Sequence, residues 1–399
     1  MKILFLHRWL VMGGGVEKVL INYLHLLKDV EEFEIDVLLD TELEDSHFSK
    51  MIPDNIRVSY IFSNDDRKLF NDLYSKKYDN ILNRIIYKFV KLKTKKGRRN
   101  KLNRHIIDGQ YDVVINFKSD HFDSYINFRT HNLPIIRWVH GSFRPNQDKY
   151  AKKAGEYLYK YKRIVAICEE MSEQIRVYLK EKKQYSFDTD RVSMIFNPIN
   201  FDEIIMKSKE IVCVKKPYFV QVARLDKGKR HCDLINIYSE LVRVNNIKEN
   251  LYIIGGGEEY ENLNTQIAKL NLQSRCFLLG EVNNPYPYMK DATLFLHTSE
   301  SEGLPTVLLE SLALNVPVIA MNCKTGVKEI LNYGKCGELI PLGDLKQFVD
   351  KTFELLNAQD KLNIYKENIK SHLQIFSEDC IKYNFKMLVK SVIEDKTKK

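Results

Sequence analysis

Two closely spaced glutamates are the residues whose type and spacing most strongly suggest a chemical role. Glu302 and Glu310 stand eight positions apart in SESEGLPTVLLES, which begins at Ser299. Pro305 suits the first turn of a helix, so the pattern predicts a helix over 306–314. The free N–H groups of its first turn would attract a phosphate, and Glu310 would accept hydrogen bonds from hydroxyls such as those of a ribose. The alternative is an acidic helix cap followed by one surface glutamate.

A basic turn offers the second group of candidate residues. ARLDKGKRH (223–231) follows an apolar run, and it places Arg224 and Lys229 on either side of a glycine-containing turn. Arginine supplies a planar fork and lysine a point charge, so the two side chains suit a clamp on a departing diphosphate. Lys227 is an alternative to Lys229 in this role. The other interpretation is a solvated basic turn.

A glycine loop near the start of the chain, MGGGVEKV (12–19), lets the backbone approach a phosphate closely. It does not match a P-loop, which needs G-x4-G-K followed by Ser or Thr. It also departs from the dinucleotide fingerprint, because Lys18 stands where the third glycine belongs. The loop therefore indicates close backbone approach without naming a ligand, and a plain tight turn remains an alternative.

Three weaker features complete the set of candidates. His140 ends the apolar run before Gly141 and could bond a sugar hydroxyl, although a histidine at a strand end is more often simply a satisfied polar residue. Gly256 lies in a glycine turn that closes another apolar run. The D-x-D pattern at 188–190 follows a lysine-rich loop and is interpreted as a surface turn.

Short apolar runs alternating with helical spacing must position these residues, and this alternation predicts two doubly wound parallel sheets. Because ligands bind at the carboxyl ends of such strands, we expect the two halves to face each other across a cleft. The predicted domains are 1–200, which contains a basic helical segment at 62–105, and 201–376; a helix over 377–399 is expected to pack back on the first domain. The runs predicted as strands are 2–6, 35–39, 113–117, 134–140, 163–168, 192–200, 218–224, 250–257, 276–280, 292–299 and 316–321.

Composition excludes several classes of protein. Hydrophobic residues make up 44% and charged residues 29%, which is typical of a globular chain and not of a disordered one. No apolar run reaches the ~18 residues of a membrane-spanning helix, and His7 and Arg8 interrupt the N-terminal run before a signal-peptide core. The seven cysteines are scattered and never form CxxC, so free thiols are expected. These features predict a cytoplasmic protein.

Positive charge is concentrated between Arg84 and Arg104, within a formal net charge of +9 for the chain. Apolar residues at 82, 85, 86, 89 and 90 have helical spacing, so a basic amphipathic helix is predicted. Such a helix can lie on an anionic membrane surface. The alternative is a solvated helix whose apolar stripe packs on its own domain. No module for nucleic acids accompanies the charge, and no nucleic-acid partner is expected.

The motifs together resemble the retaining, nucleotide-sugar-dependent glycosyltransferases of GT-B family 4. The matching segments are GGVEKV, VHG, FNPIN, ARLDKGK, IIGGGEE, LLGEV and SESEGLPTVLLES, and the resemblance is greatest over 218–342. It implies the GT-B fold, with two Rossmann-like domains. This chain has EGLP where many members have EGFG, so the loop beside the sugar is a variant.

The resemblance also implies roles for individual residues. The resemblance implies catalytic roles for Glu302, His140, Arg224 and Lys229. Arg224 and Lys229 match the diphosphate-binding pair, Glu302 matches the glutamate near the donor sugar, and Glu310 matches the one that holds the ribose. The implied donor-binding set is Gly14, Gly15, Arg224, Lys229, Gly256, Gly280, Val282, Glu302, Gly303, Leu304, Thr306, Val307 and Glu310. The family needs no metal and no cofactor beyond its donor.

The function implied is transfer of a sugar from a nucleotide-diphosphate sugar, preferably a UDP-sugar, to a glycan or lipid-linked acceptor. The setting is bacterial surface polysaccharide or lipooligosaccharide synthesis, in the cytoplasm or peripheral on the inner face of the membrane. Two alternatives stay open: a dinucleotide-dependent oxidoreductase with two Rossmann domains, and a non-catalytic protein that binds nucleotide sugars.

Overall fold

The computed structural model describes residues 1–10, 15–42, 48–117, 121–141, 143, 149–181 and 189–397. Contacts divide the chain into two compact units. Unit 1 comprises Met1–Ile167, Ser172–Pro198 and Ile381–Lys399, and unit 2 comprises Cys168–Met171 and Ile199–Cys380. The long stretch of unit 2 therefore lies, in sequence, between two segments of unit 1.

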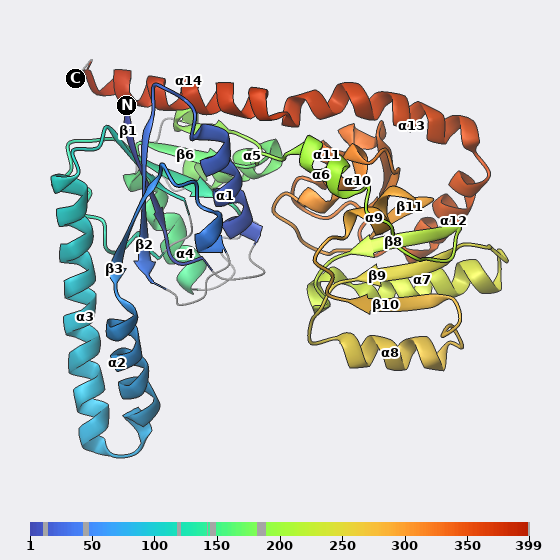
Figure 1. Ribbon diagram of the computed structural model, residues 1–399, viewed down its shortest axis with the longest axis horizontal. Coiled ribbons are helices and arrows are strands. Elements are labelled where there is room, and N and C mark those ends of the chain that lie inside the picture. Colours follow the sequence, from blue (N-terminus) through green and yellow to red (C-terminus); the bar gives the residue numbers. More distant parts are fainter. Residues whose placement is uncertain are drawn as a thin grey trace. The chain divides into compact units, whose positions relative to one another are not determined.

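The described residues of unit 1 form a seven-stranded parallel sheet in the order β3-β2-β1-β4-β5-β6-β7. Its central strands are buried and mostly apolar, and helices cover both faces, as in other parallel sheets (Figure 1). The strand order reverses between β1 and β4, so the switch point of the sheet lies at the carboxyl ends of these two strands. The strands are β1 (Lys2–His7), β2 (Glu34–Thr41), β3 (Arg57–Phe62), β4 (Val113–Asn116), β5 (Ile135–Val139), β6 (Arg163–Ala166) and β7 (Val192–Met194).

Aromatic side chains hold the covering helices of unit 1 to its sheet. Tyr23 of α1 (Gly15–Leu27) lies 5.2 Å, ring to ring, from Trp138 of β5. Phe385 of α14 (Glu378–Thr397) stacks on Phe5 of β1 at 6.1 Å. The last helix of the chain is therefore part of the core of unit 1. The other helices of this part of the chain are α4 (Lys149–Tyr157) and α5 (Glu169–Glu181).

A helical hairpin extends from unit 1, formed by α2 (Asn64–Ser75) and α3 (Ile81–Asp108) (Figure 1). Both helices start with a capped N-terminus: the Ser63 side chain accepts from Asp66 N, and the Asn80 side chain accepts from Asn83 N at 2.7 Å. Of all the residues in the two helices, only Leu102 and Ile106 are buried. Packing on the sheet therefore anchors only the C-terminal end of α3.

The described residues of unit 2 form a six-stranded parallel sheet in the order β10-β9-β8-β11-β12-β13, so its switch point lies between β8 and β11. The strands are β8 (Tyr218–Val222), β9 (Asn250–Ile254), β10 (Cys276–Gly280), β11 (Leu294–His297), β12 (Val318–Met321) and β13 (Gly337–Ile340). The helices are α6 (Phe201–Lys207), α7 (His231–Arg243), α8 (Tyr260–Lys269), α9 (Tyr286–Lys290), α10 (Thr306–Ala313), α11 (Val327–Ile330), α12 (Leu345–Leu356) and α13 (Gln359–His372).

The structure confirms two doubly wound sheets and corrects details of the prediction. β3 and β13 are strands that the sequence analysis did not identify. The run predicted as a strand over 292–299 is shorter, since Thr298 and Ser299 have already left β11 for the following loop. Pro305 caps α10 from outside, whereas the sequence analysis placed it in the first turn. Among the described residues, none of the helices is long and apolar enough to span a bilayer.

Candidate active site

The candidate site of unit 2 lies at the carboxyl ends of β8 and β11, the two strands that flank the switch point. Arg224 and Lys229 follow β8, and Glu302 follows β11. Loops that leave the sheet here diverge to opposite faces, and the divergence makes room for a ligand. The fold therefore brings two segments more than 70 positions apart in sequence to one place.

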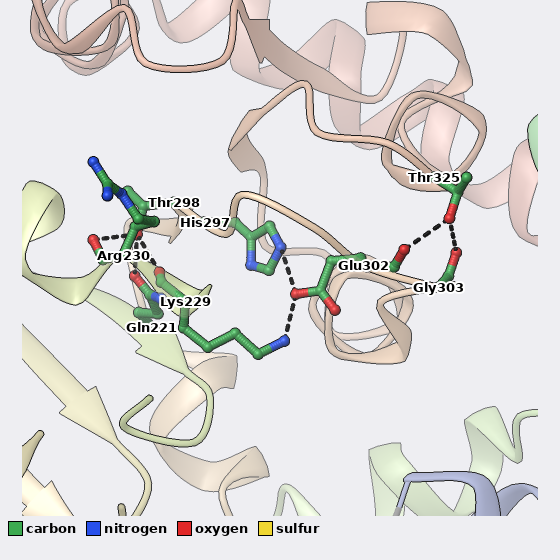
Figure 2. A network of polar contacts seen from close by, with 8 residues as sticks. All are labelled: Gln221, Lys229, Arg230, His297, Thr298, Glu302, Gly303 and Thr325. Atoms are coloured by element: carbon green, nitrogen blue, oxygen red, sulfur yellow. Dashed lines mark hydrogen bonds and ion pairs between the residues drawn. The ribbon is translucent and has the colours of Figure 1, made fainter. Parts of the chain in front are cut away.

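The centre of the site is an ion pair on one carboxylate oxygen (Figure 2). Lys229 Nζ donates to Glu302 Oε1 at 2.6 Å, and His297 Nε2 lies 3.4 Å from the same oxygen. The Lys229 and Glu302 side chains are largely buried, and His297 is 1% exposed. Both dashed lines to the Glu302 carboxylate in Figure 2 end on this one oxygen.

The electrostatics of the pair favour an ionised Glu302. Burial alone would raise the pKa of its carboxyl, but the contacts with His297 and then Lys229 outweigh burial and lower that pKa to about 2. Glu302 is therefore an anion at every physiological pH. Removing both charges from water costs free energy, and the close contact between Lys229 and Glu302 offsets that cost. The pair therefore also joins the two loops that carry these side chains.

Backbone contacts fix the loops that carry this pair (Figure 2). Thr298 Oγ1 donates to the carbonyl oxygens of Lys229 and Arg230 at 3.0 and 3.2 Å. On the other side, Thr325 Oγ1 contacts the carbonyl oxygens of Glu302 and Gly303 at 2.7 and 2.9 Å. The loop after β11 is thus held between the loop after β8 and the segment after β12.

Glycines after β9 allow the Arg224 loop to pass close by. A Cβ added to Gly255 would lie 1.9 Å from the carbonyl oxygen of Ala223, and one added to Gly257 would lie 2.3 Å from that of Leu225. Both glycines also have positive φ, which side chains disfavour. The glycine turn that the sequence analysis found at the end of this apolar run therefore makes room for the Arg224 loop.

Hydrogen bonds join Gly256 and Gly280, two predicted donor-binding residues, to neighbouring backbone along this edge of the sheet. Leu225 N donates to Gly256 O at 2.9 Å, and Gly255 N donates to Gly280 O at 2.8 Å. Val282 follows Gly280 in the loop after β10. The Arg224 side chain is 74% exposed and lies 3.3 Å from Asp226. Arg224 is therefore at the surface of the site, whereas Lys229 is inside it.

The remaining predicted residues of unit 2 surround the N-terminus of α10. Thr306 and Val307 begin this helix, and Glu310 lies buried in its second turn. Leu304 is buried just before it. Gly303 is approached by Gly326, where an added Cβ would lie 3.0 Å from the Gly303 carbonyl oxygen. The first-turn N–H groups, Glu302 and Glu310 therefore belong to one continuous segment.

The predicted residues of unit 1 stand at its own sheet edge. Gly15 begins α1 after β1, and Gly14 lies outside the described residues. His140 follows β5 and is half-buried, with its ring 4.4 Å from that of Phe117. The D-x-D pattern was interpreted as a surface turn; its last two residues begin a 3₁₀ turn, and Asp188 lies outside the described residues.

His297 is the residue of this site that sequence reasoning missed. Its signal was present, because a histidine ends an otherwise apolar strand, LFLH. Nothing in that run distinguishes a histidine that contacts a carboxylate from one that merely fills the core. The partner, Glu302, is five positions away around a loop whose path the sequence does not specify.

The segment that carries these residues is similar in sequence to known proteins. Residues 203–372 match the family model described as "Glycosyl transferases group 1". A Campylobacter jejuni N-acetylgalactosamine-N,N'-diacetylbacillosaminyl-diphospho-undecaprenol 4-alpha-N-acetylgalactosaminyltransferase is 31% identical over 50% of this chain and 55% of its own length. The lipopolysaccharide 1,6-galactosyltransferase of Salmonella typhimurium is 28% identical over 43% of this chain and 47% of its own. The chain matches about half the length of these relatives.

Solved structures match over nearly the full chain. The lipopolysaccharide outer core galactosyltransferase WaaB superposes with a TM-score of 0.73 at 20% identity, covering 98% of this chain and 99% of the other. Anabaena HepE in complex with UDP-glucose has a TM-score of 0.71 at 18% identity, covering 98% and 100%. These likenesses confirm the predicted GT-B fold. The segment that carries Arg224, Lys229, Glu302 and Glu310 lies within residues 203–372, the part of the chain that matches the glycosyl transferases group 1 model.

Proposed function

We propose that this protein is a retaining glycosyltransferase that moves a sugar from a nucleotide-diphosphate sugar to a glycan or lipid-linked acceptor. The observation that carries the proposal is the buried Lys229–Glu302 pair at the switch point, next to the N-terminus of α10 and inside the matched family segment. A UDP-sugar is the preferred donor, which the complex of the similar HepE with UDP-glucose supports. The names of the relatives support surface polysaccharide or lipooligosaccharide synthesis as the setting.

Each residue has a defined task in the proposed reaction. Arg224, Lys229 and the first-turn N–H groups at Thr306 and Val307 hold the diphosphate and stabilise its charge as it departs. Glu302 contacts the donor sugar, and Glu310 accepts hydrogen bonds from the ribose. The acceptor hydroxyl attacks on the face that the diphosphate leaves, and a phosphate oxygen takes its proton, which retains the configuration.

The acceptor is assigned to unit 1, where His140 is the candidate contact, while Gly14 and Gly15 are assigned to the donor diphosphate. We propose no metal or cofactor, because two cations and a helix N-terminus already balance the diphosphate. Addition of a chelator is therefore expected to leave turnover unchanged. We also place the protein in the cytoplasm, in peripheral contact with the inner face of the membrane.

A thermal-shift screen against UDP-, GDP- and ADP-sugars tests donor binding. A true donor at about 100 times its Kd should stabilise the fold by about 2.7 kcal/mol. Release of nucleoside diphosphate then tests catalysis, and Glu310→Ala is expected to weaken the response to donor by about 10-fold to 100-fold, through the lost charged hydrogen bonds. Glu258→Ala, an exposed glutamate of the same unit, serves as the matched control.

The same measurements discriminate the alternatives, which the comparisons do not support. A thermal shift with a nicotinamide dinucleotide and none with nucleotide sugars would favour the oxidoreductase. Donor binding without any release of nucleoside diphosphate, with or without acceptor, would favour the non-catalytic binding protein.

A further inference from the structure

We propose that one face of the α2–α3 hairpin, residues 64–108, is a docking surface for an anionic lipid bilayer. The inference deepens the peripheral location proposed above by naming the surface that contacts the lipid. Two independent observations carry it: an apolar face that the fold leaves uncovered, and the distribution of charge over the chain.

Large apolar side chains of the hairpin are exposed in a continuous series. On α3, Ile85 and Phe89 expose 58% and 68% of their surface, although such residues are normally buried. The positions repeat at intervals of three and four, so they share one side of the helix. The exposed residues of this series lie between positions 78 and 92 and are Tyr78, Ile81, Leu82, Ile85, Ile86, Phe89 and Leu92; α2 adds Leu69.

The uncovered face is not explained by packing within the hairpin. The helix α2 contacts a different side of α3, where the rings of Phe70 and Tyr74 both lie 5.7 Å from Tyr87. The fold is anchored farther along, at Leu102 and Ile106. The alternative raised from the sequence, an apolar stripe packed on its own domain, therefore fails for residues 81–92. A contiguous exposed apolar surface of this kind marks an interaction site.

Charge concentrates on the same element. Residues 64–108 contain 14 lysines and arginines against 5 aspartates, a net charge of +9, which equals the formal net charge of the entire chain. The rest of the sequence is therefore neutral overall. On α3, Arg84, Lys88, Lys91 and Lys95 also repeat at helical spacing and form a basic row beside the apolar face.

A bilayer with anionic lipids is the partner that satisfies both properties. Lipid phosphates would pair with the basic row, while the apolar side chains enter the boundary between headgroups and acyl chains. Lysine side chains can extend along the apolar surface and keep their charges at headgroup level. A second copy of this chain would bring the same positive charge against the hairpin, and a nucleic acid would leave the apolar face unpaired.

Flotation of the full-length protein with vesicles tests the surface directly. Vesicles of equal parts phosphatidylglycerol and phosphatidylcholine are compared with phosphatidylcholine alone, at low and high salt. We expect binding to the anionic vesicles that weakens at high salt. The triple variant K88Q/K91Q/K95Q should bind ~100-fold more weakly, since each charge near an anionic surface contributes a factor of roughly five.

The apolar half of the surface needs its own variant. I85Q/F89Q/L92Q keeps all charges and changes only exposed positions, so its helix content and melting should match the wild type while its binding falls at least ~10-fold. The matched control K248Q/K269Q/K290Q removes three exposed charges from unit 2 and should bind like the wild type.

Several outcomes would overturn the proposal. They are equal binding to neutral and anionic vesicles, no binding at all, full binding by both hairpin variants, or equal loss in the unit 2 control. A dimer that I85Q/F89Q/L92Q dissolves would assign the face to a second copy instead. Donor hydrolysis in vesicle-free buffer is measured in parallel and should be unchanged in the hairpin variants. Its absence in the wild type, with flotation intact, would count against the proposed reaction and leave the surface standing.

Discussion

Charged side chains are buried and paired in one region of the molecule and exposed in another. At the switch point of unit 2, Lys229 and Glu302 are largely buried and paired at 2.6 Å. On α3, Lys88 and Lys95 stand on a solvated helix beside exposed apolar residues. A buried pair is costly to form and rigid once formed, whereas exposed charges contribute little to stability and remain able to meet a partner. The buried pair therefore suits a site that holds a small ligand in one position, whereas the exposed charges of α3 suit a surface that meets a large, fluid partner.

The largest effect that the comparison predicts follows from Lys229→Ala. Loss of the buried cation should lower donor turnover by about 10²–10³-fold, as removal of one preorganised donor does elsewhere. It also leaves the Glu302 carboxylate without its ion pair, so unfolding free energy should fall by about 3–5 kcal/mol. Turnover and urea denaturation measure the two effects.

A matched double variant separates the two consequences of Lys229→Ala. Adding Glu302→Gln removes the stranded charge and should recover most of the stability without recovering turnover. Wild-type turnover in folded Lys229→Ala would remove the lysine from the proposed reaction and leave the pair a purely structural feature.

Acid should weaken the buried pair in a defined pH range. The pKa of Glu302 is lowered from 4.5 to about 2, so its contribution to stability is fully present above pH 4.5 and is lost as the pH falls toward 2. The lost contribution amounts to about 3 kcal/mol. Urea titrations from pH 6 to pH 2 should show the wild type losing this advantage over Glu302→Gln. Parallel curves for the two proteins would contradict the lowered pKa.

His297 is expected to act as a positioning residue, with a smaller effect than Lys229. His297→Asn removes the imidazole beside Glu302 Oε1, so kcat should fall about 10-fold, while the KM for donor changes little. The pKa of Glu302 should rise, which moves the acid limb of its stability curve to higher pH. A variant that loses stability with unchanged kcat and an unchanged acid limb would show that His297 only fills the core.

The smallest effects should come from the exposed face of the hairpin. Ile85→Ala and Phe89→Ala are expected to change unfolding free energy by less than about 0.5 kcal/mol each, because neither side chain is buried. Leu102→Ala and Ile106→Ala, at the anchored end of the same helix, should cost about 2–5 kcal/mol. Thermal melts compare the four. Similar losses of unfolding free energy in Phe89→Ala and Leu102→Ala would mean that the apolar face is covered in solution.

Much of the architecture could be predicted because local pattern and global fold agree. The β-branched runs at 113–117 and 218–224 have few alternatives to a buried parallel strand, and E-x7-E with EGLP marks the loop and helix around Glu310. β13 was missed because four residues, GELI, carry too little pattern to stand out. β3 was missed because it directly precedes the basic segment, which was predicted to be helical.

The contacts of the site were less predictable than its members. Sequence analysis grouped Lys229 with Arg224 as a clamp, but pairing of Lys229 with Glu302 depends on how two loops diverge at the switch point. The same limit hid His297. The exposure of Phe89 is likewise a tertiary property, since helical spacing alone describes a stripe that is buried on a neighbour equally well.

The place of α14 in unit 1 has a consequence for synthesis of the chain. Residues 199–380, which form most of unit 2, are synthesised before Phe385, whose ring packs on Phe5 and Tyr23 of unit 1. Until then the first half of the protein presents an unfinished aromatic surface. The half that is translated first is therefore the half that matures last, and chaperones that recognise nascent apolar surfaces have the longest access to it.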